Sequence, residues 1–412
     1  MDAEDAEDAE NAADADNADA AADEDGAATD AAGDDTGEAE RDYHVRQYES
    51  ADREAVLSLY ETVFDRTDPD WFDWRYVENP YLDETPIAVV EADNGDVVGA
   101  RPSVPIPLRI GNQRVLAVIQ VDPMVHPDHR RRGLFSKMVT YVYDHYATRD
   151  PQVSIGFPNE AVLGALDKLG ERLSLHRGVR RECPVYYRVQ DPTALTSLPS
   201  IGGERATNAV AKLAATATRS YLSLRTGRPR DADVTVRREA GVPVEELTTL
   251  VATSPLPHVH ADRDAEFYAW RYANPRFEYE TLLAEWGGSP AAAFVVGTQR
   301  DVASTVVHVT DVAPLTGGEV WTDAVDALLA RVVADNDDAA LLSVFGEALP
   351  RRLLEKYGFA RNDEAPLSRV TTPNYLVARP LTDERIDEWV VGGQRLSEGE
   401  RWRFTFCERE LG

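Results

Sequence analysis

The sequence VLAVIQVDPMVHPDHRRRGLFS, residues 115–136, joins three patterns that decide the fold. Residues 115–125 are mostly apolar, which predicts one long buried strand. The run Arg130-Arg131-Arg132-Gly133 follows, and apolar residues then recur at helical spacing from Met138 to Tyr146. The order of strand, arginine-rich glycine turn and amphipathic helix predicts an α/β unit. Free backbone N–H groups, the helix dipole and guanidinium groups converge at such a turn, which favours pyrophosphate binding.

Three consecutive arginines on their own are more typical of a solvated surface. Here they stand between a buried strand and a helix start, in a chain that is otherwise strongly acidic. That position favours the phosphate hypothesis. Gly133 fits it, because a phosphate can approach the main chain closely where no Cβ intervenes.

Val125-His126-Pro127 followed by Arg130-Arg131-Arg132-Gly133-Leu134-Phe135 resembles the acyl-CoA signature of the GNAT superfamily of N-acyltransferases. That signature is Gln or Arg, two residues, Gly, one residue, then Gly or Ala, and Phe135 departs from its last position. Residues 153–170 resemble the strand and helix that come next in the family. The resemblance covers residues 43–189, and the signature itself about a tenth of the chain.

The resemblance implies a sheet that splays beside the signature strand, with the pantetheine arm paired to main-chain groups and the pyrophosphate held by the turn. It implies acetyl-CoA, or another acyl-CoA, as co-substrate and direct attack by the amine of a small-molecule acceptor. No His or Cys pair has metal-ligand spacing, so we expect no metal. The expected acyl-CoA-binding residues are Met124, Val125, Arg130, Arg131, Arg132, Gly133, Leu134, Phe135, Ser136 and Asn159.

The acid and the base are less defined by the sequence. Asp122 is the candidate general base, although an Asp before Pro123 is also typical of a bulge. In many family members a tyrosine protonates the departing thiolate, and Leu166 stands at that position here. Asn159 matches an Asn that contacts CoA in the family, and it is equally suited to cap the following helix.

The second half of the chain repeats the first. Three segments of the first half recur in the same order: Tyr43-His44-Val45-Arg46 as Val234-Thr235-Val236-Arg237, Trp74-Arg75-Tyr76 as Trp270-Arg271-Tyr272, and Pro184-Val185-Tyr186-Tyr187 as Pro373-Asn374-Tyr375-Leu376. This predicts an α/β (α+β) protein of two GNAT-like units, each a mixed twisted sheet flanked by helices. We expect a disordered acidic tail at 1–40, an acyltransferase unit at 41–190, a helical connector at 191–233 and a degenerate unit at 234–412.

The counterpart of the arginine-rich turn, residues 313–319, contains no Arg and ends at Glu319, which would repel a pyrophosphate. We therefore expect the second unit not to bind CoA and to form a wall of the acceptor cleft or to stabilise the first unit. The first unit has Trp74 and the second has Trp270 at the equivalent position. Because the unit without the arginine-rich turn also has this tryptophan, a structural role is favoured, with each indole packed between helix and sheet.

The charge of the chain excludes some function classes. The formal net charge is -30, and residues 1–40 hold 17 of the 73 acidic residues and no Lys or Arg. A nucleic-acid partner is not expected, because phosphates need a basic surface. The excess of acid and the scarcity of Lys are typical of a cytoplasmic protein from a high-salt organism. Two cysteines, no long apolar run and an acidic N-terminus predict a reduced cytosolic location, no membrane span and no secretory signal.

Two alternatives stay open beside the acyltransferase. A non-catalytic GNAT-fold binding or scaffold protein is consistent with Leu166 and with the degenerate second half. Aminoacyl transfer from a charged tRNA fits poorly with the acidic surface. The sequence leaves the acceptor, the acyl chain length and the oligomeric state open.

Overall fold

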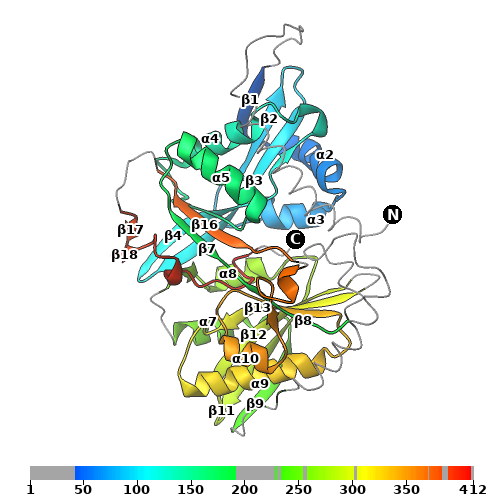
Figure 1. The fold of residues 1–412 in the computed structure, drawn as a ribbon, viewed down its shortest axis with the longest axis vertical. Helices are drawn as coiled ribbons and strands as arrows, with labels where there is room; N and C mark the ends of the chain where they lie inside the picture. Colours follow the sequence, from blue (N-terminus) through cyan, green and yellow to red (C-terminus); the bar gives the residue numbers. More distant parts are fainter. Residues whose placement is uncertain are drawn as a thin grey trace.

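The computed structural model describes residues 42–191, 227, 229, 233–253, 258–300, 304–369, 371–382 and 388–409. The acidic tail expected at 1–40 and most of the connector expected at 191–233 lie outside these residues. Two mixed sheets flanked by helices make up the described chain (Figure 1), which confirms the expected α/β class. Within the described ranges, no helix combines the length and the apolar character needed to cross a membrane.

The first sheet has the strand order β1-β2-β3-β4-β6-β16-β7, and only β4 and β6 run parallel in it. Helices α2 and α3 share a core with Val104 and Ile106 on one face. Helix α4 packs against Val98 and Val118 on the other face, beside α5 (Figure 1). The strands are β1 (Tyr43–Gln47), β2 (Ile87–Ala92), β3 (Val97–Ile110), β4 (Gln113–Gln120), β6 (Val153–Gly156), β7 (Val179–Glu182) and β16 (Tyr375–Pro380), and β5 (Met124–Val125) and β10 (His260–Ala261) also pair with β3. The helices are η2 (Ser50–Asp52), α2 (Arg53–Phe64), α3 (Pro69–Phe72), η3 (Asp73–Val77), η4 (Pro127–His129), α4 (Leu134–Tyr146) and α5 (Glu160–Arg172).

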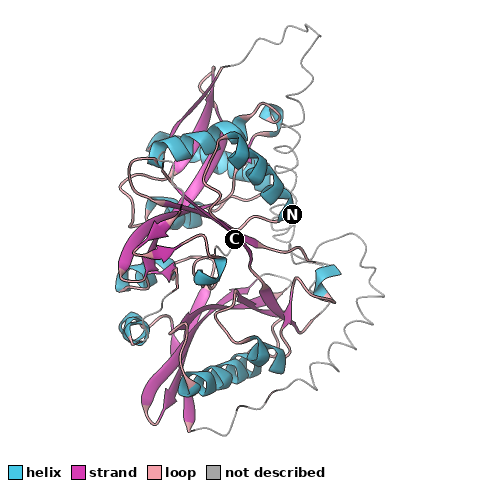
Figure 2. Cartoon of the chain, turned by 60° about the vertical axis from the view of Figure 1, so that its left-hand side comes forward, coloured by secondary structure: helices cyan, strands magenta, loops and turns pink. Residues whose placement is uncertain are grey.

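The second sheet has the order β9-β11-β12-β13-β14-β8-β15, and only β13 and β14 run parallel. The long helix α9 covers one face and α7 the other, and Figure 2 shows α9 along the lower sheet. The strands are β8 (Val185–Val189), β9 (Val234–Ala240), β11 (Glu278–Trp286), β12 (Ser289–Arg300), β13 (Thr305–Ala313), β14 (Leu341–Phe345) and β15 (Ala360–Arg361). The helices are α7 (Val244–Ala252), α8 (Ala265–Arg271), α9 (Glu319–Asp335), α10 (Arg351–Lys356) and η7 (Leu367–Arg369).

The two halves of the chain exchange one strand. Strand β8 follows β7 directly in sequence, yet it lies in the second sheet between β14 and β15. Strand β16 makes the reverse move and lies between β6 and β7, and Figure 1 shows it in orange among the cyan and green strands of the upper sheet. All five residues of β8 are buried, so this strand needs a sheet that is covered on both faces. Each sheet is therefore completed by the other half.

Trp74 and Trp270 join the two halves directly. Their rings stack at 5.7 Å with an interplanar angle of 16°. The Trp74 indole donates to the Trp270 carbonyl at 2.7 Å, and the Trp270 indole donates to the Trp74 carbonyl at 3.1 Å. The predicted structural role of the two tryptophans is consistent with these contacts. The predicted packing between helix and sheet was wrong, because each indole stacks on the indole of the other half.

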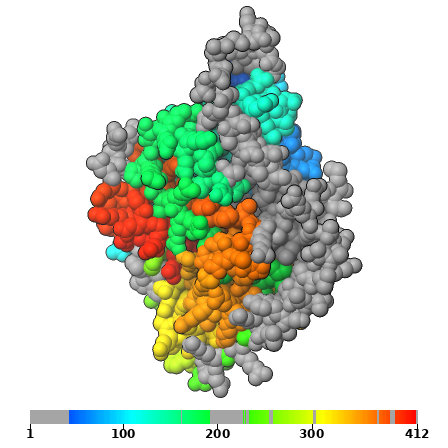
Figure 3. Space-filling model, viewed as in Figure 1, coloured from blue at the N-terminus to red at the C-terminus, as the bar shows by residue number. Residues whose placement is uncertain are grey.

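The C-terminal segment returns to the joint between the sheets. Val259 bridges Trp402, and Arg181 in β7 donates to the carbonyls of Gly399 and Trp402. Figure 3 shows this segment in red beside the green residues of the first half. It contains β17 (Val390–Val391), β18 (Gln394–Arg395) and η8 (Gly399–Arg401).

Candidate functional site

The first sheet opens at the carboxyl end of β4. The parallel pairing of β4 with β6 ends at Ile119 and Ile155, and its pairing with β3 ends at Gln120. The next ladder pairs join β5 to Gly99 and Ala100. Among the described strands β5 pairs only with β3, so its edge toward β6 has no strand partner. The amide groups of an extended ligand can pair with such an edge.

The prediction of one continuous strand over residues 115–125 was wrong, because the strand is interrupted near Asp122. Asp122 has a φ of 41°, in the left-handed region, and Pro123 has no N–H to donate. The strand is therefore divided into β4 and β5, with Asp122 at the interruption. The side chains of Met124 and Val125 are buried in the protein, so only their main chain is free to meet a ligand.

The turn before α4 leaves the start of that helix open. Gly133 is the N-cap, with a φ of 71°, and no side chain caps the helix. A Cβ built on Gly133 would meet no atom within 4 Å, so the space in front of this residue is empty. Leu134 anchors the helix in the core next to Met138, whereas Phe135 and Ser136 are only half-buried. The first amides of α4 are thus available to an anion, and they belong to the residues 131–136 predicted to hold the pyrophosphate.

The three arginines of the turn have no acidic partner among the described residues. Arg130 donates from Nε to the Val125 carbonyl at 3.3 Å. Arg131 is exposed, with a φ of 59°, and Arg132 is half-buried. Within the part of the chain that the structure describes, none of the three forms an ion pair. This concentration of uncompensated positive charge suits a polyanion.

Asn159 lies across the opening, just beyond β6. Its Oδ1 accepts from the Val162 N–H at 3.0 Å, which makes it the N-cap of α5. The cap accounts for the local structure by itself. Its side-chain amide group remains a candidate donor to a ligand in the opening.

Asp122 is the centre of a buried polar network. It is 8% exposed, and its Oδ2 accepts from Tyr60 and from Arg75, both at 3.0 Å, and from Arg66 at 3.4 Å. Tyr60 also bonds the Tyr76 hydroxyl at 2.7 Å. No sequence pattern indicates Tyr60 or Arg66, because helix α2 and its carboxyl end come near the interruption only in the folded chain. The Oδ1 of Asp122 forms no hydrogen bond to any described residue and is the oxygen that remains able to accept a proton.

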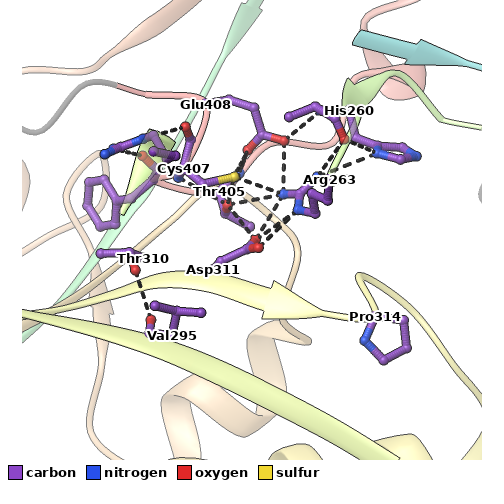
Figure 4. A network of polar contacts seen from close by, with 12 residues as sticks. His260, Arg263, Val295, Thr310, Asp311, Pro314, Thr405, Cys407 and Glu408 are labelled. Carbon is purple, nitrogen blue, oxygen red and sulfur yellow. Dashed lines mark hydrogen bonds and ion pairs between the residues drawn. The ribbon is translucent and has the colours of Figure 1, made fainter. Parts of the chain in front are cut away.

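Asp311 occupies the corresponding place on β13, and its network is fully buried (Figure 4). Both of its oxygens accept from Arg263, and in addition Oδ1 accepts from Thr405 and Oδ2 from Tyr268. Arg263 also pairs with Glu408 at 2.9 Å. Burial raises the pKa of the neighbouring Cys407 thiol well above its usual value. The network holds the C-terminal segment against the second sheet.

A small cavity lies beneath the opening, between the α2 face of the first sheet and the tryptophan pair. Its volume is about 30 Å³, which is enough to admit water-sized groups. Its walls are mainly apolar. They are formed by Trp74, Arg75, Val104, Ile106, Ile119, Val121, Trp270, Arg271, Cys407, Glu408 and Arg409.

The counterpart turn in the second half is filled by its own side chains. Trp321 donates from Nε1 to the Pro314 carbonyl at 2.9 Å, and a Cβ on Gly317 would overlap Trp321. Leu315 is also buried, and Glu319 is the first residue of α9. Strand β13 continues to Ala313, but its pairing with β14 ends at Val309 and its register with β12 shifts at Val295, so the second sheet also diverges here. The Asp311 network lies at this divergence.

Comparisons with known proteins agree with this geometry. Residues 44–167 match the family model described as Acetyltransferase (GNAT) domain. No curated protein matches the chain. A solved GCN5-related N-acetyltransferase from Anabaena variabilis is similar in fold, with a TM-score of 0.54, 11% identity, and coverage of 83% of this chain and 73% of that chain.

Two further solved structures share the fold. One is Saccharomyces cerevisiae N-myristoyltransferase with bound myristoyl-CoA, with a TM-score of 0.51, 11% identity, and coverage of 82% of this chain and 78% of that chain. The other is a probable N-acyltransferase from Enterococcus faecalis, with a TM-score of 0.52, 9% identity, and coverage of 83% and 73%. At such identities these structures establish the fold alone. Residues 44–167 are thus similar to the GNAT acetyltransferase domain, and the described fold is similar to that of solved N-acyltransferases.

Proposed function

We propose that the protein transfers an acyl group, with acetyl-CoA as donor, to the amine of a small-molecule acceptor. The observation that supports this most is that the opening in the first sheet, beside β5, continues into the arginine-rich turn before α4. The free edge of β5 leads directly to an uncapped helix start beside three arginines that have no ion-pair partner among the described residues. The similar fold of an N-myristoyltransferase described with bound myristoyl-CoA also favours an acyl-CoA donor.

In this proposal the main chain of Met124 and Val125 pairs with pantetheine. The amides of residues 131–136 and the guanidinium groups of Arg130, Arg131 and Arg132 hold the pyrophosphate. Asn159 contacts the donor from the other side of the opening.

The reaction is a direct attack. The acceptor nitrogen adds to the thioester carbonyl, and the protein orients the two reactants and stabilises the oxyanion. Asp122 is the candidate base, because its Oδ1 has no donor among the described residues and lies at the interruption of the strand.

We infer that the chain is a tandem of two GNAT-like units with a degenerate C-terminal copy. The identical strand order of the two sheets and the reciprocal tryptophan bonds support this inference. The second copy is not expected to bind CoA, because Trp321 fills its turn and Glu319 repels an anion. It would support the first unit and close the acceptor side.

Calorimetric titration with acetyl-CoA tests the donor site. Arg131→Glu combined with Gly133→Asp should weaken binding by about 100-fold or more, because two favourable contacts with a polyanion are replaced by repulsion. The matched control is Gly318→Asp in the second turn, where a Cβ also meets no atom within 4 Å. It should leave the affinity unchanged.

Equal affinities for the wild type and the double variant would remove the proposed pyrophosphate site. If acetyl-CoA binds, release of free thiol across a panel of small amines tests for transfer. Binding without turnover on any amine would favour the non-catalytic binding protein.

A further inference from the structure

Arg101 lies at the point where the first sheet opens. It belongs to β3, between Ala100, which pairs with Met124, and Ser103, which pairs with Gln120. Its guanidinium carbon is 5.1 Å from the centre of the Phe135 ring, on the first turn of α4. The side chain therefore faces the α4 side of the opening, opposite the interruption in the strand.

Arg101 is a buried cation without an anion. It is 6% exposed, and its only hydrogen bond to a described residue joins Nε to Gln120 Oε1 at 2.9 Å. No carboxylate of the described chain is within ion-pair distance of it. Arg263, a buried cation of the second half, pairs with both Asp311 and Glu408. A buried charge without such a partner is destabilising, because no attraction offsets its loss of hydration.

The surroundings fix the guanidinium in place and keep it charged. Gln120 is itself held, because its Nε2 donates to Ser103 Oγ at 3.0 Å. Burial lowers the pKa of Arg101 to about 10, which leaves it protonated at neutral pH. The titratable neighbour that acts on it is Tyr143, a phenol whose own pKa is raised by burial and which is therefore neutral. The terminal nitrogens are thus free to meet a negative group in the opening.

We propose that Arg101 stabilises the thiolate that leaves when the acyl group is transferred. This proposal rests on the proposed function, in which pantetheine runs along β5 and the thioester reaches the interruption. The acceptor nitrogen forms its bond to the carbonyl carbon, the carbon–sulfur bond breaks, and the electron pair stays on sulfur. The amine proton passes to the base, and the thiolate later takes a proton from water. Arg101 would thus stabilise by its charge the leaving thiolate that a tyrosine protonates in many family members, at the position where this chain has Leu166.

The test uses free CoA as the probe and requires no acceptor. The pKa of the CoA thiol is measured on the bound complex from the ultraviolet absorbance of the thiolate. In the wild type it should lie below that of CoA in water, because a nearby cation favours the charged form. Arg101→Gln should raise it by about one unit or more, and Arg101→Lys by less. Arg109→Gln, at the other end of the same strand, removes the same charge and should change nothing.

The outcomes separate this proposal from the proposed function. A thiol pKa in the wild-type complex equal to or above that of free CoA would overturn the role of Arg101 without the need for any variant. Weaker CoA binding by Arg101→Gln with an unchanged thiol pKa would also overturn it, because Arg101 would then only hold pantetheine. If the wild type does not bind CoA, the proposed function itself fails.

Discussion

The turns after β4 and β13 occupy the same place in their two sheets and have opposite surroundings. The first presents Gly133, an uncapped helix and three arginines to open space. The second also leaves its helix uncapped at Gly318, but Trp321 packs on Gly317 and Glu319 stands where the first turn has positive charge. Unpaired arginines beside free amides repel one another unless an anion meets them, whereas the packed Trp321 adds buried area and a hydrogen bond. The first half therefore keeps an electropositive turn that the second half lacks.

The two aspartates beside these turns differ in the same way. All hydrogen bonds of Asp122 to described residues end on Oδ2, whereas both oxygens of Asp311 are used. Asp311 is 0% exposed. One carboxylate thus retains a free oxygen, and the other serves only the structure.

Matched substitutions should separate these aspartates by activity rather than by stability. Asp311→Asn and Asp122→Asn should each lower the free energy of unfolding by about 3 kcal/mol, because each replaces the charged partner of a buried arginine, Arg263 or Arg75, by a neutral amide. Only Asp122→Asn should also change the pH–rate profile of transfer, because only Asp122 keeps an oxygen without a donor among the described residues. Urea unfolding measures the stabilities, and initial rates across pH measure the profile. An unchanged pH–rate profile in Asp122→Asn would exclude Asp122 as the base.

Lowering the pH should destabilise the buried network around Asp311 by protonating His260. Burial, followed by the charge of Arg263, lowers the pKa of His260 from 6.5 to about 4. The unfolded chain therefore binds more protons between these pH values, and the stability present above pH 6.5 is lost as the pH falls toward 4. The loss is about 3 kcal/mol. Unfolding free energies of His260→Asn should decline less over this range, whereas those of the exposed His44→Asn should follow the wild type.

Substitutions of Trp74 and Trp270 test whether contacts between the two halves contribute jointly to the free energy of unfolding. Trp74→Phe and Trp270→Phe each remove one indole donor to the other half and should each cost about 1 kcal/mol. Because the rings stack, the double variant should depart from additivity by about 0.5 kcal/mol or more. A double-mutant cycle by denaturant unfolding measures this coupling. Strict additivity would show that the halves are stabilised separately at this contact.

The sequence predicted the local elements well and the long-range partners poorly. Apolar spacing and Gly133 were sufficient for the order of strand, turn and helix, because these signals are local. The segments at Val185 and Tyr375 were recognised as equivalent, but alternation of side chains cannot say which sheet a strand joins. Arg101 was missed for a similar reason. Its burial depends on α4, which is packed over it from a distant part of the chain.

The exchange of β8 and β16 determines when this protein can finish folding during synthesis. Strands β6 and β7 flank a gap that only residues 375–380 fill. At 5–20 residues per second the ribosome needs roughly 10–40 s to make the chain between β6 and β16. Throughout that interval the nascent first half has two unpaired edges beside the proposed donor site. That site is therefore complete only after nearly the whole polypeptide has emerged.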